Sequence, residues 1–130
     1  MRPFILLAAM LLAGPSHAQD TARPVQVLKE TVTGMPRTER QEISVLRAEF
    51  APGQATVFHT HRFPVTVHVL EGTFTLELEG RAPVVVRAGE SFVEPPAVRM
   101  TGFNRSASER MRVLIFYVSE EGQPFLDPAH

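Results

Sequence analysis

The feature that most constrains the fold is a series of short apolar segments, each of which ends close to glycine or proline. Between Ile43 and Val118 these segments run for about four to eight residues and are rich in valine and phenylalanine. No stretch after Ala18 keeps a helical period over about ten residues, and 11 prolines would interrupt long helices. The pattern therefore predicts an all-β fold, a sandwich or barrel in a single domain.

The expected strands of this domain, residues 41–120, are 43–50, 55–60, 65–70, 73–79, 84–87, 91–94, 98–103 and 112–118. Residues 19–40 are expected to form an extended arm with at most one short strand, because Gly34 and Pro36 break its pattern. Residues 121–130 are expected to form a tail too short and proline-bound for a regular element, attached to the body by Phe125 and Leu126.

The first eighteen residues have the layout of a secretory signal peptide. Arg2 precedes a continuous apolar run over residues 4–13, Gly14-Pro15 breaks it, and Ser16 and Ala18 are small. The run is about half the ~20 residues that a membrane-spanning helix needs. We therefore expect a mature protein from about Gln19 that has no membrane span and is periplasmic or secreted.

Charge and cysteine content exclude several classes of function. The chain has 13 basic and 14 acidic residues, a formal net charge of −1, which argues against nucleic-acid binding. It has no cysteine, so disulfides and thiol catalysis are excluded. Stability must come from the core, from a bound metal or from oligomerisation.

The residues that most clearly point to chemistry are His59 and His61. In a strand, residues two apart lie on the same face, so two imidazoles can converge on one metal ion. Gly53 precedes the pair by six positions and Gly72 follows it, while Gly89, Pro95 and Asn104 form a second spaced set.

These two sets resemble the paired motifs of the cupin superfamily, G-(x)5-H-x-H-(x)3,4-E-(x)6-G and G-(x)5-P-x-G-(x)2-H-(x)3-N. The resemblance covers residues 43–118 and implies a double-stranded β-helix, the cupin jelly-roll barrel, with a pocket inside it. It also implies a metal held by three histidines and a glutamate, a small-molecule ligand, and, together with the extended arm, a homodimer.

The chain departs from this pattern at two of the four ligand positions. His59 and His61 match the first two histidines, but Val65 stands at the glutamate position and Met100 at the last histidine. Ala97 replaces the glycine of the second motif.

Three interpretations of this departure stay open. In the first interpretation the site has lost its metal, and the pair merely lines a pocket. Alternatively, Glu94 rebuilds the ligand set, since an unpaired acid in its apolar strand would be costly. His68 is a further imidazole, but strand parity turns it to the opposite face from Val65 and predicts a structural role. In the third interpretation Met100 completes a soft site suited to copper.

Two functions therefore remain open from the sequence. The first is an exported binding protein that holds a metal ion (a divalent transition metal or copper) or a small ligand in an incomplete cupin site. The second is a metal-dependent enzyme of oxygenase or isomerase type. The missing ligands favour the first, because catalysis by a metal needs firm protein ligands and an open position.

Overall fold

A computed structural model describes residue 14 and residues 20–130 of the chain; the predicted signal peptide lies outside these residues except for Gly14. The described residues contain strands and no helix. The strands are β1 (Gln41–Phe50), β2 (His59–Thr60), β3 (Val65–Glu71), β4 (Thr73–Leu78), β5 (Val84–Arg87), β6 (Ser91–Glu94), β7 (Met100–Phe103), β8 (Met111–Glu120) and β9 (Asp127–Pro128). In this described part, no helix is long and apolar enough to cross a membrane.

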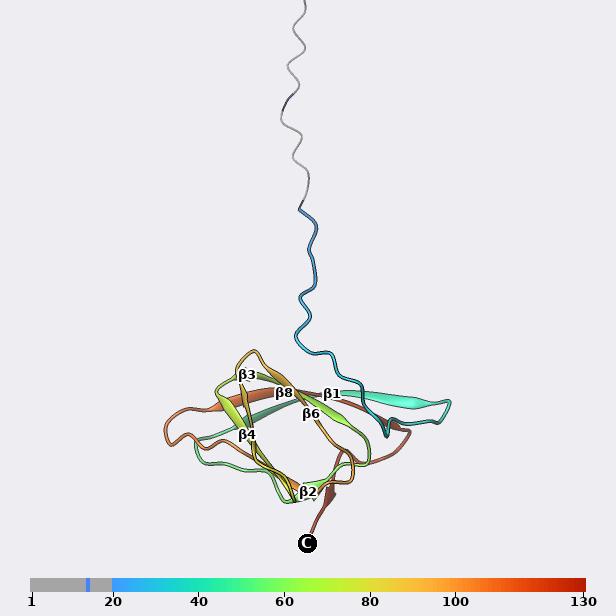
Figure 1. Cartoon of the computed structure of the whole chain (residues 1–130), viewed down its shortest axis with the longest axis vertical. Coiled ribbons are helices and arrows are strands. Elements are labelled where there is room, and N and C mark those ends of the chain that lie inside the picture. The colour runs from blue at the N-terminus through green and yellow to red at the C-terminus, as the bar shows by residue number, and fades with distance from the viewer. Residues whose placement is uncertain (1–13, 15–19) are drawn as a thin grey trace, which may run out of the picture.

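The strands form two antiparallel sheets that face each other (Figure 1). One sheet has the order β1-β8-β3-β6 and the other the order β5-β4-β7-β2-β9. Because neighbours in each sheet are mostly distant in sequence, the chain crosses repeatedly between the sheets, which gives the double-sheet jelly roll expected from the sequence.

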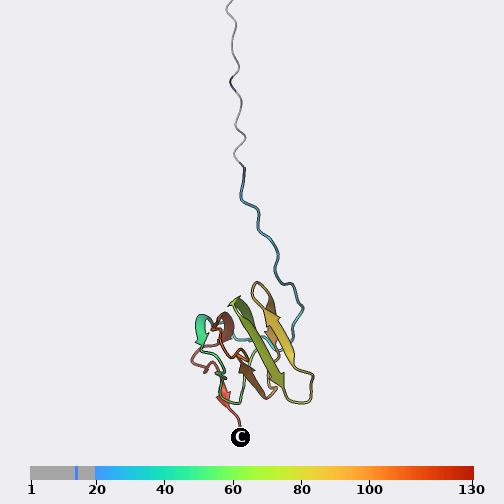
Figure 2. The same ribbon diagram turned by 90° about the vertical axis from the view of Figure 1, so that its left-hand side faces the viewer.

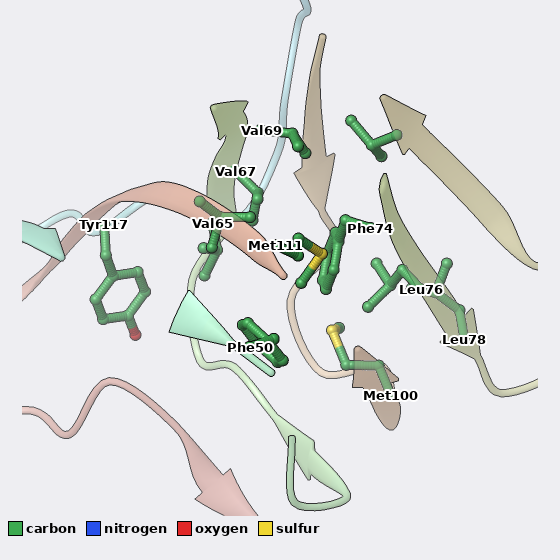
Figure 3. Packing of buried hydrophobic residues seen from close by; sticks show 12 residues of the cluster. Phe50, Val65, Val67, Val69, Phe74, Leu76, Leu78, Met100, Met111 and Tyr117 are labelled. Atoms are coloured by element: carbon green, nitrogen blue, oxygen red, sulfur yellow. The ribbon is translucent and has the colours of Figure 1, made fainter. Parts of the chain in front are cut away.

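Alternation along the strands places the core between the two sheets. In β3 the side chains of Val65, Val67 and Val69 are buried, and in β4 those of Phe74, Leu76 and Leu78 are buried, while their neighbours face outward. Figure 3 shows these residues meeting in one cluster. The histidine pair lies at the end of this cluster, where β2 runs beside β7 and β9.

Two details of the predicted secondary structure were wrong, and they concern residues 55–60 and the tail. Residues 55–60 do not form one strand: Ala55 makes an isolated bridge to Phe103, and only His59–Thr60 is regular. Residues 20–40 of the arm, for which at most one short strand was expected, contain none. The tail does contain one, β9, whose Pro128 is tolerated because β9 is the last strand of its sheet.

Positive backbone φ angles occur at the turns that the motifs mark. Gly72, with φ +78°, joins β3 to β4 so tightly that a Cβ atom there would lie 2.7 Å from the carbonyl oxygen of Arg110. Ala97, which replaces the second motif's glycine, keeps a left-handed conformation with φ 59°. The turn geometry is therefore retained although the glycine is not.

The arm leaves the barrel on the side opposite to β2 and the last residues of the chain (Figures 1 and 2). Its residues Val25 and Val27 are 85% and 57% exposed. The arm therefore contributes little to the core around the histidine pair.

Candidate functional site

The two histidines of the motif meet inside the barrel. His59 lies in β2 and His61 just beyond it, and their side chains are almost completely buried. The two Nε2 atoms are 3.1 Å apart, and the rings meet edge to face at 77°. The pair therefore presents two nitrogen atoms to one point.

Backbone carbonyls fix the orientation of both rings. His59 Nδ1 lies 2.6 Å from the carbonyl oxygen of Val57, and His61 Nδ1 lies 2.7 Å from that of Phe125. A carbonyl only accepts, so each Nδ1 carries a hydrogen and donates it. In the neutral rings the two Nε2 atoms are consequently unprotonated, with their lone pairs turned toward each other.

A carboxylate from the opposite sheet completes the group. Glu94, on β6, is 5% exposed, and its Oε2 lies 3.1 Å from Nε2 of His61. Two nitrogen lone pairs and a carboxylate oxygen held this close together in a buried site are stabilised by a cation among them, either a proton on an imidazole or a metal ion. Burial, the largest influence, lowers the pKa of His59, and the hydrogen bond to Val57 only partly opposes it.

The two positions that depart from the cupin pattern, Val65 and Met100, each lie directly opposite a residue of the site. Glu94 is the direct cross-strand partner of Val65, the position where the pattern has its glutamate. Met100, at the position of the last histidine, is the direct partner of His59 and is completely buried. Directly opposed residues share one face of a sheet, so both side chains belong to the interior face. Figure 3 shows Met100 directed into the core.

His68 does not join this group, as strand parity predicted. It lies between buried Val67 and Val69, and its Nδ1 is 2.8 Å from the hydroxyl oxygen of Ser91. The imidazole is therefore a structural group of the outer sheet face.

The pocket around the pair is small and mostly apolar. Its volume is about 50 Å³, and its lining includes Phe74, Ile115, Phe125 and Leu126 besides His59, His61 and Glu94. Such a volume suits an ion or one or two waters and leaves no room for a drug-sized ligand.

Sequence reasoning missed two residues beside the pair. The Phe125 ring lies 4.8 Å from that of His61 and 5.4 Å from that of Tyr117. The Tyr117 hydroxyl is buried and makes no hydrogen bond of ordinary geometry to the residues that the structure describes, and burial raises its pKa. The signal for Tyr117 was that it is the chain's one tyrosine; no sequence signal marked the carbonyl of Phe125 as a histidine partner.

As the side chains stand, no three histidine, cysteine, aspartate or glutamate residues of the described ranges 14 and 20–130 form a group able to hold a metal ion. Glu94 reaches His61, and His61 reaches His59. The site is therefore a two-imidazole pair with a carboxylate on one side and a thioether-bearing residue on the neighbouring strand.

Fold and site together define a class, the double-sheet β-barrels with a histidine-lined interior. A family model described as the cupin domain matches residues 46–117, more than half of the chain. The chain belongs to the cupin family. No curated protein sequence matches it significantly.

Solved structures agree on the fold. An RmlC-like cupin from Shewanella frigidimarina has a TM-score of 0.53 and 23% identity, over 62% of this chain and 69% of that one. A cupin-like protein from Thermotoga maritima has a TM-score of 0.56 and 21% identity, over 67% and 64%. The DMSP lyase DddQ from Ruegeria pomeroyi has a TM-score of 0.57 and 15% identity, over 67% of this chain but 43% of its own. At such identities the likeness concerns the fold alone.

Proposed function

We propose that this cupin is an exported binding protein that holds one transition-metal ion at His59 and His61, with Glu94 as the adjacent carboxylate. The observation that carries the proposal is that Nδ1 of each ring contacts a backbone carbonyl oxygen, which fixes the tautomer of both rings. Both Nε2 lone pairs are then directed at one buried point beside a carboxylate. Metal-binding histidines characteristically donate a hydrogen bond from the ring nitrogen that does not bind the metal.

The spacing of the nitrogens fits the same proposal. Two nitrogen ligands of a tetrahedral ion, each ~2.0–2.1 Å from it, lie about 3.3 Å apart. The Nε2 atoms are 3.1 Å apart, so His59 and His61 would need little movement to hold an ion. A third ligand requires either a rotation of Glu94 toward His59 or a contribution from Met100. An ion bound there would supply the positive charge that the buried Glu94 carboxylate lacks when both imidazoles are neutral.

The pocket volume favours binding over catalysis. A drug-sized substrate has no room beside the pair in the closed pocket of about 50 Å³. The likeness to a DMSP lyase brings the alternative, a metal-dependent enzyme, to this chain by fold analogy only. Residues 1–18 support export to the periplasm or beyond the cell.

The test is to measure the metal content of the protein after purification without an affinity tag from the exported fraction. The mass of the same protein shows whether the chain is cleaved after Ala18. After chelation, addition of Zn(II), Ni(II), Mn(II) or Cu(I) should raise the melting midpoint for the preferred ion. At 100-fold above the dissociation constant the stabilisation is ~2.7 kcal/mol, or about 10 °C for a domain of this size.

Matched histidine variants locate the effect. His59→Ala and His61→Ala should each remove most of the metal-dependent rise, measured against the variant's own metal-free midpoint. His68→Ala, which changes an imidazole on the outer face, should keep the rise. A parent protein that contains no metal and ignores all four ions would contradict the proposal and leave the pair as polar lining of a pocket.

A further inference from the structure

The segment of residues 123–129, called here the covering segment, closes the mouth of the histidine pocket. Phe125 and Leu126 line the pocket, and β9 pairs with β2 at His59 and Thr60. The carbonyl of Phe125 also accepts the hydrogen of His61 Nδ1. The segment therefore both shields the pair and orients one of its rings.

Phe125 and Leu126 are the apolar side chains that hold the covering segment at the pocket, and its side-chain polar interactions lie at the surface. Arg62 contacts both carboxylate oxygens of Asp127, at 2.8 and 3.0 Å, and also contacts the side chain of Gln123. Both members of the Arg62–Asp127 pair are partly exposed, with side chains 46% and 39% accessible. The two-residue β9 adds little pairing, and Ala129 N donates to the Phe58 carbonyl at 2.9 Å. Segments with few apolar contacts and solvent-exposed bonds open at the lowest free energy.

The groups under the cover are polar. The Tyr117 ring packs edge to face on Phe125, and its buried hydroxyl makes no hydrogen bond of ordinary geometry to another described residue. Opening of the cover would expose this hydroxyl to water. The closed pocket, at about 50 Å³, has no room for anything larger than an ion with its water.

We propose that the covering segment is a latch: it swings away from the barrel end to give access to His59 and His61, and the Arg62–Asp127 pair holds it shut. The latch decides when an ion or ligand reaches the pocket and when it leaves. This inference rests on the proposed function only for the identity of what enters the pocket, a metal ion. The opening of the covering segment itself needs no metal.

The experiment measures access to the imidazoles directly, by diethyl pyrocarbonate labelling of the full chain and mass spectrometry, with and without chelator. Exposed His130 is the internal reference. In the parent, His59 and His61 should be labelled much more slowly than His130. Asp127→Asn should raise their rates by up to about 5-fold, the effect of an exposed ion pair, and Phe125→Ala should raise them further.

Two controls separate a latch from general loosening. Glu77→Gln removes a comparable exposed ion pair, between Glu77 and Arg105. Glu77 lies on β4, which β7 and β2 separate from β9, so this change should leave both labelling rates unchanged. Raising the salt from 0.01 to 1 M shortens the screening length from about 30 to about 3 Å, so it should speed labelling in the parent but not in Asp127→Asn. The denaturation midpoint of Asp127→Asn should stay near that of the parent.

The outcomes distinguish this inference from the metal proposal. Labelling that responds to Asp127→Asn in protein that binds no metal supports the latch and overturns the metal site. Metal binding with labelling of the pair unchanged in both Asp127→Asn and Phe125→Ala overturns the latch. Rates that rise only in proportion to lost global stability overturn it as well.

Discussion

At the scale of single residues, the site is defined by which ring nitrogens of His59 and His61 carry a hydrogen. The carbonyls of Val57 and Phe125 accept the Nδ1 hydrogens of His59 and His61, which determines that the opposite nitrogens face the pocket. Glu94 adds an oxygen 3.1 Å from one of them. The metal proposal rests on this grouping, and under it the neighbouring residues would decide which cation suits the site.

Met100 is the residue that separates soft from hard metals. A thioether is neutral and polarizable, and it suits Cu(I) far better than Mn(II). Since Met100 is the cross-strand partner of His59, Met100→His should weaken the preference for Cu(I) and admit Zn(II) or Ni(II). Competition between Cu(I) and Zn(II) at fixed pH measures this for the parent and the variant.

A second variant extends this comparison. Adding Val65→Glu to Met100→His recreates the four-ligand cupin pattern, but places a second carboxylate opposite Glu94. Without metal the double variant should be less stable than the parent, because close buried carboxylates repel each other. With metal it should recover much of that loss. Weak, equal binding of both ions by the parent, unchanged by Met100→His, would remove Met100 from the site.

At the scale of elements, tight turns bring the strands of the two sheets into register. The β3–β4 turn is the more crowded of the two turns that flank β4. Gly72 has a positive φ, and a Cβ atom there would collide with the backbone at Arg110. The β4–β5 turn at Gly80 needs a positive φ of 73° but has open space around it. The two glycines therefore differ in steric crowding alone.

Alanine substitutions at these turns should separate backbone strain from collision. Gly80→Ala should cost about 1 kcal/mol of unfolding free energy, the price of a left-handed alanine. Gly72→Ala should cost ~3 kcal/mol or more, because its Cβ would lie 2.7 Å from the Arg110 carbonyl oxygen and the chain must move. Urea unfolding of both variants measures the difference. Equal costs would mean that the backbone at Arg110, just before β8, yields freely and that the turn does not hold β3 in place.

At the scale of the whole molecule, one sheet ends in a long strand with an apolar outer face. Ile43 and Val45 of β1 are 79% and 60% exposed, and Phe116, the cross-strand partner of Val45, is 42% exposed. β1 is the edge strand of its sheet, so its free backbone groups are also open to pairing. Exposed apolar patches of this kind mark interaction sites in soluble proteins.

We therefore expect this face to form the homodimer predicted from the sequence. Light scattering after size exclusion should give twice the mass of the mature chain. Ile43→Asp with Val45→Asp should yield monomers, because two charges would be buried in the contact. Val85→Asp, which alters a residue 47% exposed on β5 in the other sheet, is the matched control and should stay dimeric. A parent that is monomeric at all concentrations would contradict the dimer.

The sequence by itself determined the features that depend on neighbouring residues. Alternation in β3 and β4, with glycine and proline at the turns, predicted an all-β barrel, because burial on one face of a strand has a period of two. The same parity placed His68 outside the core. The sequence pattern failed for residues 55–60 and for β9, because strands this short are held by pairing with their neighbours and not by a pattern of their own.

Only the tertiary structure decided how the site is assembled. Glu94 meets His61 across the two sheets, Phe125 accepts a hydrogen bond from a residue 64 positions away, and Met100 lies opposite His59. No local rule relates these positions, since their approach depends on strand order and register. The histidine pair could be found from its spacing, and Glu94 and Met100 were candidates from the sequence. The contact of Glu94 with His61, the segment that covers the pair and the tautomers of its rings follow from the way the barrel closes.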